Sequence, residues 1–256
     1  MQTRVDLNAD AGESLGRWKL GHDSELMAHV TSVNVACGYH ASDPVTMRES
    51  VRTAVATGTA IGAHPGLPDL VGFGRRRMAL RPDEAAQLVL YQTGALQATA
   101  RAEGAEVVHV KPHGALYGMA LTDDAITTAI TEAVLRLDPD LMIFWLAGPT
   151  ADLARSLGAT VAREGFADLE YTDEGHIIVE PEPKAKDPDA VAQQAVDLLE
   201  GHVTSTSGKH LEVEVDTICL HGDRPNAVEI CEALVRRLDD LGVERAPAAQ
   251  LLRGLS

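Results

Sequence analysis

Short runs of apolar residues recur along the chain, and each is followed first by a loop and then by a helical pattern. The loops contain His, Gly or Pro, and the runs have the length of buried strands. No Pro/Gly/Ser-rich linker or internal repeat interrupts this alternation, so a single domain over residues 1–256 is expected. The predicted strands cover residues 4–8, 32–37, 60–63, 106–111, 141–146, 159–163 and 216–220.

The helices between these runs are marked by start and stop residues. Asp43-Pro44 supplies a cap and a first-turn proline ahead of an apolar periodicity that Gly58 ends. Further helices are predicted from Pro82 to about Gly104, from Pro188 through Leu199, and from Asn226 onward.

Seven strand–helix units indicate a parallel sheet covered by helices, either an open doubly wound sheet or a closed barrel. A strand buried on both faces should be almost entirely apolar, but several strands here alternate instead. In the first, Val5, Leu7 and Ala9 form one face, and the other face carries Asp6, Asn8 and Asp10. This pattern favours an α/β fold with a (β/α) barrel and a polar mouth at the C-terminal strand ends.

Composition narrows the class of protein. The formal net charge is −16, from 22 basic and 38 acidic side chains, so nucleic acid and anionic membranes are poor partners. The three cysteines have no CxxC spacing, which points to a reducing compartment. The N-terminal residues contain no apolar signal-peptide region, and the longest uncharged apolar run, 141–149, is too short to cross a bilayer. A cytoplasmic location is expected.

Four of the ten histidines share a context that the others lack. Each follows a predicted strand and has a glycine or proline within two residues; they are His40, His64, His113 and His221. In parallel α/β folds such positions meet at one end of the sheet. A lone histidine there usually makes a local hydrogen bond, but four, together with Asp6, Asn8 and Asp10, favour a functional site.

Arginine is also clustered, in Arg75-Arg76-Arg77 after Gly72 and Gly74. Guanidinium groups suit carboxylate or phosphate, and Lys111 and Arg224 are further cations at strand ends. A solvated loop paired with the abundant acids is the alternative. Neither GxGxxG nor GxxxxGK[ST] follows a strand. The residues alone indicate hydrolysis or proton transfer on a small anionic molecule, with or without metal.

Motifs along nearly the whole chain resemble those of the LamB/YcsF family. They occur in the family's order: residues 6–13, DLNADAGE; 34–41, NVACGYHA; 62–66, GAHPG; 72–76, GFGRR; 110–117, VKPHGALY; and 219–223, CLHGD. The resemblance implies an irregular seven-stranded barrel similar to that of polysaccharide deacetylases.

The family is similar to the A-type component of the bacterial ATP-dependent 5-oxoprolinase, which opens the lactam of 5-oxoproline to L-glutamate with two partner subunits, B and C. The resemblance therefore implies a small anionic lactam as substrate and ATP as a cofactor used through the complex. It implies catalytic roles for Asp10, His40, His64 and His113, and substrate binding by Asp6, Asn8, Asn34, Arg75, Arg76, Lys111 and His221. If a divalent metal binds, Asp10, His40 and His64 are the candidate ligands.

Two departures from the family pattern bear on the substrate. Leu169 and Glu180 stand where relatives usually have arginines, so a different lactam is one alternative. Two others are a metal-dependent deacetylase or amidase acting without ATP, and a non-catalytic subunit that binds ligand or partners.

Overall fold

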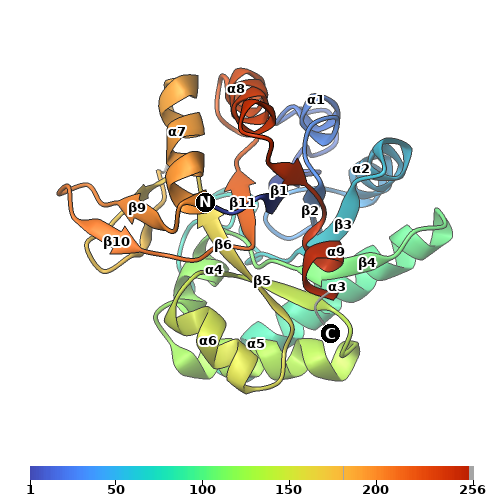
Figure 1. Cartoon of the computed structure of the whole chain (residues 1–256). Coiled ribbons are helices and arrows are strands. Elements are labelled where there is room, and N and C mark those ends of the chain that lie inside the picture. The colour runs from blue at the N-terminus through green and yellow to red at the C-terminus, as the bar shows by residue number, and fades with distance from the viewer. Residues whose placement is uncertain (181, 254–256) are drawn as a thin grey trace.

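The computed structural model describes residues 1–180 and 182–253, and its centre is a closed barrel of seven parallel strands (Figure 1). Each strand pairs with the next in chain order, and the last pairs with the first through Asp6 and Thr217. The barrel strands are β1 (Arg4–Ala11), β2 (Ser32–Ala36), β3 (Ala60–His64), β4 (Val107–Val110), β5 (Met142–Leu146), β6 (Val161–Phe166) and β11 (Thr217–Leu220). All seven predicted strands and the barrel are confirmed.

Helices surround the barrel (Figure 1). The predicted ones are present as α2 (Pro44–Thr57), α3 (Pro82–Ala102), α7 (Pro188–Leu199) and α8 (Ala227–Asp240). Asp43 caps α2 by accepting hydrogen bonds from two first-turn amides, and Gly58 ends it with a φ of 72°. The remaining helices were not predicted: α1 (Asp23–Met27), α4 (Gly114–Ala120), α5 (Asp124–Leu137), α6 (Pro149–Ser156) and α9 (Ala248–Arg253).

Short strands outside the barrel were also not predicted. The connection from β6 to α7 contains the hairpin β7 (Glu170–Tyr171) and β8 (Ile177–Ile178), which lies at the mouth end. A second hairpin joins β9 (His202–Thr204) to β10 (His210–Glu212), and β12 (Glu244–Arg245) pairs with β1 beside Arg4 and Val5.

The two faces of β1 are buried in different surroundings. Val5, Leu7 and Ala9 are fully buried in the hydrophobic core. Asp6 and Asn8 are fully buried as well, but their side chains bond to polar groups of other barrel strands. The alternation of β1 thus separates an apolar core from a polar barrel interior.

Asp6 lies deep in that interior, four residues and roughly 13 Å along the strand from Asp10. Its carboxylate accepts hydrogen bonds from the hydroxyls of Thr31, Ser32 and Thr217. Burial raises its pKa, although those hydroxyls oppose the rise. The structure therefore does not bring Asp6 to the mouth. Among the described residues, no helix has the length and apolar character needed to cross a membrane.

Candidate functional site

A small cavity of about 40 Å³ lies at the C-terminal end of the barrel strands. One side carries ionisable groups and the other is apolar, because the β7–β8 hairpin and its flanking residues cover the mouth. The lining residues are Asp10, His64, Arg75, Lys111, Pro112, His113, Gly114, Tyr117, Phe166, Leu169, Ile177, Val179 and His221. Three of the four histidines singled out from the sequence line this cavity.

Asp10 is the central carboxylate of the mouth. Its oxygens lie 3.3 Å from His64 Nε2 and 3.2 Å from Lys111 Nζ, and one accepts a hydrogen bond from Asn34 Nδ2 at 2.9 Å. Burial alone would raise the pKa of Asp10, but His64 and Lys111 hold it well below its usual range. Asp10 is therefore a fixed negative charge against which the imidazole of His64 is oriented.

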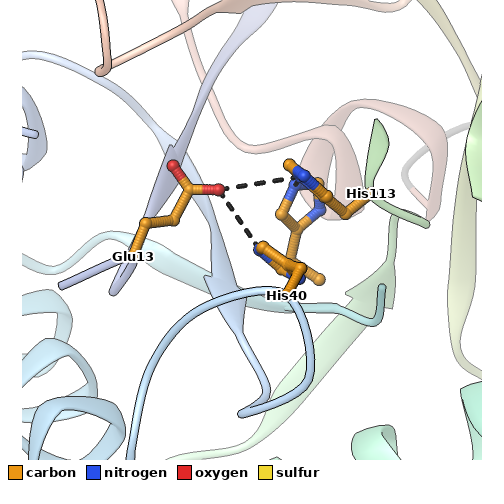
Figure 2. Close-up of side chains that lie close together, drawn as sticks. Glu13, His40 and His113 are labelled. Atoms are coloured by element: carbon orange, nitrogen blue, oxygen red, sulfur yellow. Dashed lines mark hydrogen bonds and ion pairs between the residues drawn. The ribbon is translucent and has the colours of Figure 1, made fainter. Parts of the chain in front are cut away.

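Glu13 contacts two of the histidines, and it was not among the predicted site residues. One of its oxygens lies 3.2 Å from His40 Nε2 and 3.7 Å from His113 Nδ1 (Figure 2). The rings of His40 and His113 stack with centroids 3.7 Å apart. Glu13 follows β1 through Gly12, whose φ of 71° turns the chain toward these rings.

Burial controls the protonation of this group. It raises the pKa of Glu13 well above the usual range, and Asp10 and Asp223 add to the rise. Burial also lowers the pKa of His40 and of His113 well below the usual range. Neighbouring histidines lower both values further, because a second positive charge beside the first is unfavourable. Both imidazoles are accordingly neutral near pH 7 and can act as metal ligands or proton acceptors.

Lys111 is an internal counter-ion. Nζ lies 2.9 Å from Glu164, contacts Asp10, and donates to Cys219 Sγ at 2.9 Å. Burial would lower the pKa of Lys111, but Asp10, Cys219 and Glu164 keep it well above its usual range. The ammonium is thus paired inside the barrel, at the edge of the cavity that Lys111 helps to line.

The two arginines predicted to bind substrate, Arg75 and Arg76, lie in different environments. Arg75 lines the cavity and pairs with Asp223 at 2.7 Å, a contact that joins the connections after β3 and β11. Arg76 pairs with Asp69 on the outside of the molecule, with its side chain 65% exposed. The structure therefore brings Arg75 to the mouth and leaves Arg76 away from it.

Arg224 is held by ion pairs within the fold. Its buried guanidinium pairs with Asp168 at 2.9 Å and with Glu180 at 3.2 Å, so it is not free to hold an anion. Glu180, one of the two departures expected from the family resemblance, therefore connects the end of the β7–β8 region to the β11–α8 connection. Leu169, the other departure, lies in the cavity wall.

The remaining predicted residues lie at the mouth or just below it. His221 lies 3.9 Å from Asp10 through Nε2 and 3.0 Å from Asp168 through Nδ1. Burial would lower the pKa of His221, but Asp168 raises it. Asn34 Nδ2 donates to Asn8 Oδ1 at 2.8 Å, and Asn34 Oδ1 lies 2.8 Å from His109 Nε2. These amides brace the floor beneath Asp10.

Residues able to hold a metal ion are gathered at this mouth. The donor atoms of Glu13, His40, His64 and His113 all lie within 4.8 Å of one another, and all four residues are buried. Three imidazoles and a carboxylate are the donors that zinc and related divalent ions prefer. The candidate ligands His40 and His64 are part of this set, whereas Asp10 contacts it through His64. The residues present therefore fit a divalent metal.

Comparison with known proteins gives concordant matches over the whole length. The model of the LamB/YcsF family matches residues 5–253. A Pyrococcus furiosus protein, named as the A-type component of 5-oxoprolinase, is 46% identical over 254 residues, which cover 98% of this chain and 100% of that protein.

Two solved structures extend the comparison to the fold. The lactam utilization protein of Thermus thermophilus has a TM-score of 0.88 at 45% identity, over 95% of this chain and 99% of that chain. The peptidoglycan N-acetylglucosamine deacetylase Bc1960 has a TM-score of 0.52 at 9% identity, over 98% of this chain and 89% of that one. The second likeness concerns the fold alone, and it agrees with the expected deacetylase-like barrel.

Proposed function

Because the chain belongs to the LamB/YcsF family, we propose that it is the A-type component of an ATP-dependent 5-oxoprolinase. It opens the lactam of 5-oxoproline to L-glutamate together with B- and C-type partner subunits. The name of the Pyrococcus relative and that of the Thermus protein support this assignment over almost the full length of both chains. Hydrolysis of a C–N bond is the reaction class, and the cytoplasm is the compartment that supplies ATP.

The observation that carries the proposal is the Asp10–His64 pair in the cavity wall, with Arg75 lining the same cavity. A carboxylate that orients an imidazole is an arrangement suited to moving the proton of an attacking water. A guanidinium nearby suits the carboxylate of the substrate or a phosphate.

ATP is required because an unstrained five-membered lactam resists attack by water. Transfer of the γ-phosphoryl group to the lactam oxygen makes the ring carbon electrophilic. Water then adds to that carbon and the C–N bond breaks, which leaves the acyl phosphate of the opened chain. A second water hydrolyses this acyl phosphate and releases phosphate. The lactam, ATP and two water molecules are consumed, and L-glutamate, ADP and phosphate are formed.

The chain's own residues supply the proton transfers. Asp10, kept ionised beside His64 and Lys111, takes the proton of the attacking water and passes it to Nε2 of His64. The Nδ1 atom of His64 is held by the Lys111 carbonyl. Glu13, whose burial favours the protonated carboxyl, returns a proton to the departing ring nitrogen. Arg75 exchanges its pairing with Asp223 for the anionic group of the substrate.

The test is ATP-dependent glutamate release from 5-oxoproline by the chain with its two partner subunits. Asp10→Asn should lower kcat by roughly 10² to 10⁴-fold while the thermal transition shows that the fold is kept. Asp124→Asn, an exposed substitution on α5, is the matched control and should be silent. Near-normal turnover by the Asp10→Asn variant would overturn the assignment of Asp10.

The Glu13–His40–His64–His113 cluster favours one second candidate, a metal-dependent amidase or deacetylase acting without ATP. These four residues would then hold the ion, which when bound polarises the amide carbonyl and acidifies water. Activity of the chain alone, without ATP and lost on chelation with EDTA, would support this candidate. Strict dependence on ATP and partners, unaffected by removing a tightly bound metal, would exclude it.

A further inference from the structure

The mouth cavity is too small for the substrate of the proposed reaction. Its volume is about 40 Å³, which is room for a few water molecules at most. Sites that bind small molecules generally have volumes of roughly 300–1,000 Å³. A five-membered lactam with its carboxylate therefore cannot enter this cavity unless part of the wall moves.

Most of the cavity wall is fixed by the barrel and by helix α4. His64 and Phe166, for example, lie within barrel strands. The connection that carries Arg75 is joined to α4 by a hydrogen bond of 2.9 Å, which the Ala115 amide donates to the Gly74 oxygen. Movement of these parts would disturb the barrel ladder or the start of a helix.

One side of the wall is attached to the fold much more lightly. Ile177 and Val179 form this side, and they belong to residues 174–180, which we call the flap. Within residues 1–180 and 182–253, the ladder of the β7–β8 hairpin contains two residue pairs, and the hydrogen bonds of residues 174–179 all stay inside the hairpin. A segment with so few contacts opens at a low cost in free energy.

The flap also borders a second, larger space. A cleft of about 510 Å³ lies beside its tip, at Glu174, Gly175 and His176. The β5–α6 connection and the β9–β10 hairpin form much of the remaining wall of this cleft. The tip of the flap therefore has open space beside it, while Ile177 and Val179 close the mouth.

Both ends of the flap are held by specific polar contacts. Just before it, Asp173 accepts hydrogen bonds from two serine hydroxyls in the turn between β9 and β10. At its end, Glu180 pairs with buried Arg224 at 3.2 Å. If Glu180 leaves, Arg224 keeps its pair with Asp168 at 2.9 Å, so opening does not leave a buried guanidinium without a counter-ion.

We propose that the flap lifts to admit the substrate and that it closes by setting Ile177 and Val179 against the apolar ring carbons. The Glu180–Arg224 pair is the latch that holds it shut. The nature of the substrate, a small lactam, rests on the proposed function. Closure sets apolar side chains opposite the charged side of the cavity and excludes bulk water from the activated ring.

The latch is tested by hydrogen–deuterium exchange of the full chain, followed by mass spectrometry. Glu180→Gln keeps the size of the side chain but removes the charge that holds Arg224, so the amides of residues 174–180 should exchange about tenfold faster or more. Glu244→Gln breaks the exposed pair with Arg4 at the opposite end of β1. It is the matched control and should leave the exchange of the flap unchanged.

Closure over the substrate is tested in the complex of the chain with its two partner subunits. Excess 5-oxoproline without ATP, so that it binds and is not consumed, should slow the exchange of the flap amides by about tenfold or more. Val179→Ala shortens the apolar side of the closed cavity. In the presence of ATP it should raise KM for 5-oxoproline by about threefold or more.

The results separate the flap from the proposed function. Unchanged exchange of the flap in the Glu180→Gln variant overturns the latch. Closure is overturned if 5-oxoproline is turned over with ATP but does not slow the flap without it, and an unchanged KM of the Val179→Ala variant overturns the contact with the ring. If the complex releases no glutamate from 5-oxoproline while Glu180→Gln still speeds the exchange of the flap, the proposed function fails and the latched flap stands.

Discussion

Nε2 of His64 lies 2.9 Å from Nδ1 of His113, and the other nitrogen of each ring faces a backbone carbonyl oxygen. His64 Nδ1 is 2.7 Å from the Lys111 oxygen, and His113 Nε2 is 2.8 Å from the Phe73 oxygen. Because a carbonyl only accepts, those outer nitrogens carry the protons, and the two facing nitrogens present lone pairs. A proton or a metal cation between them is required to make so short a separation favourable.

This geometry predicts that the site takes up a divalent ion. Titration of metal-free chain with Zn²⁺ by calorimetry, or with Co²⁺ by visible absorption, should show one tight site. His113→Ala should weaken binding by about tenfold or more, because it removes a donor. His22→Ala, an exposed histidine, should leave the affinity unchanged. Equal affinity in both variants would place the ion elsewhere.

Replacing Lys111 should strongly lower the free energy of unfolding. Lys111→Met leaves the buried carboxylates of Asp10 and Glu164 without their counter-ion, so the free energy of unfolding should fall by about 3–5 kcal/mol. Adding Glu164→Gln to this variant should recover part of the loss. Denaturant unfolding followed by circular dichroism measures both. Exposed Lys19→Met is the control and should change stability by less than about 0.5 kcal/mol.

The ion pairs of Asp168 should make the stability of the fold depend on pH in the acid range. Burial would raise the pKa of Asp168, but His221 and Arg224 lower it to about 2, below the ordinary aspartate value of 3.8. A carboxyl shifted this way stabilises the fold by about 2 kcal/mol above pH 3.8, and this contribution is lost as pH falls through about 2. Asp168→Asn should therefore be less stable than the unaltered chain near neutral pH, with a difference that shrinks in acid. A difference independent of pH would contradict the ion-pair explanation.

Adding a side chain at Gly62 should cause a steric clash inside the barrel. A Cβ on Gly62 would overlap the ring of His109, which stacks on Phe144 with centroids 4.0 Å apart. Gly62→Ala should therefore lower the free energy of unfolding by about 1–3 kcal/mol. Gly94→Ala on α3, where a Cβ meets nothing within 4 Å, should raise it by about 0.5–1 kcal/mol. A silent Gly62→Ala variant would show that His109 moves freely.

The strands were predictable because each carries its own signal. Alternation in β1 separated Val5 and Leu7 from Asp6 and Asn8, and the barrel follows from repeating such units. Helix α5 was missed although Asp123 caps it and Pro139 follows its last residue by two positions, which are both ordinary boundary signals. The β7–β8 and β9–β10 hairpins were missed because their short strands carry too few residues for a period to be detected.

The location of the site histidines was predictable from the sequence, whereas the location and partners of the charged residues were not. His64 and His113 follow strands, so the fold alone directs them to one mouth. Glu13 lies beyond a strand end, where the turn at Gly12 and not a periodicity sets its direction. The roles of Arg76 and Arg224 depend on Asp69, Asp168 and Glu180, and pairing with acids that lie elsewhere in the fold leaves no local pattern in the sequence.

The pairing of β1 with β11 closes the barrel, and it forms late during synthesis on the ribosome. Asp6 meets the Thr217 hydroxyl 211 positions later, so β1 lacks that neighbour until most of the chain has been made. At typical elongation rates this delay lasts about 10–40 s. During it one edge of β1 and the buried carboxylate of Asp6 stay open to water and to other nascent chains. Yield on overexpression should therefore depend on chaperones that shield the first strand.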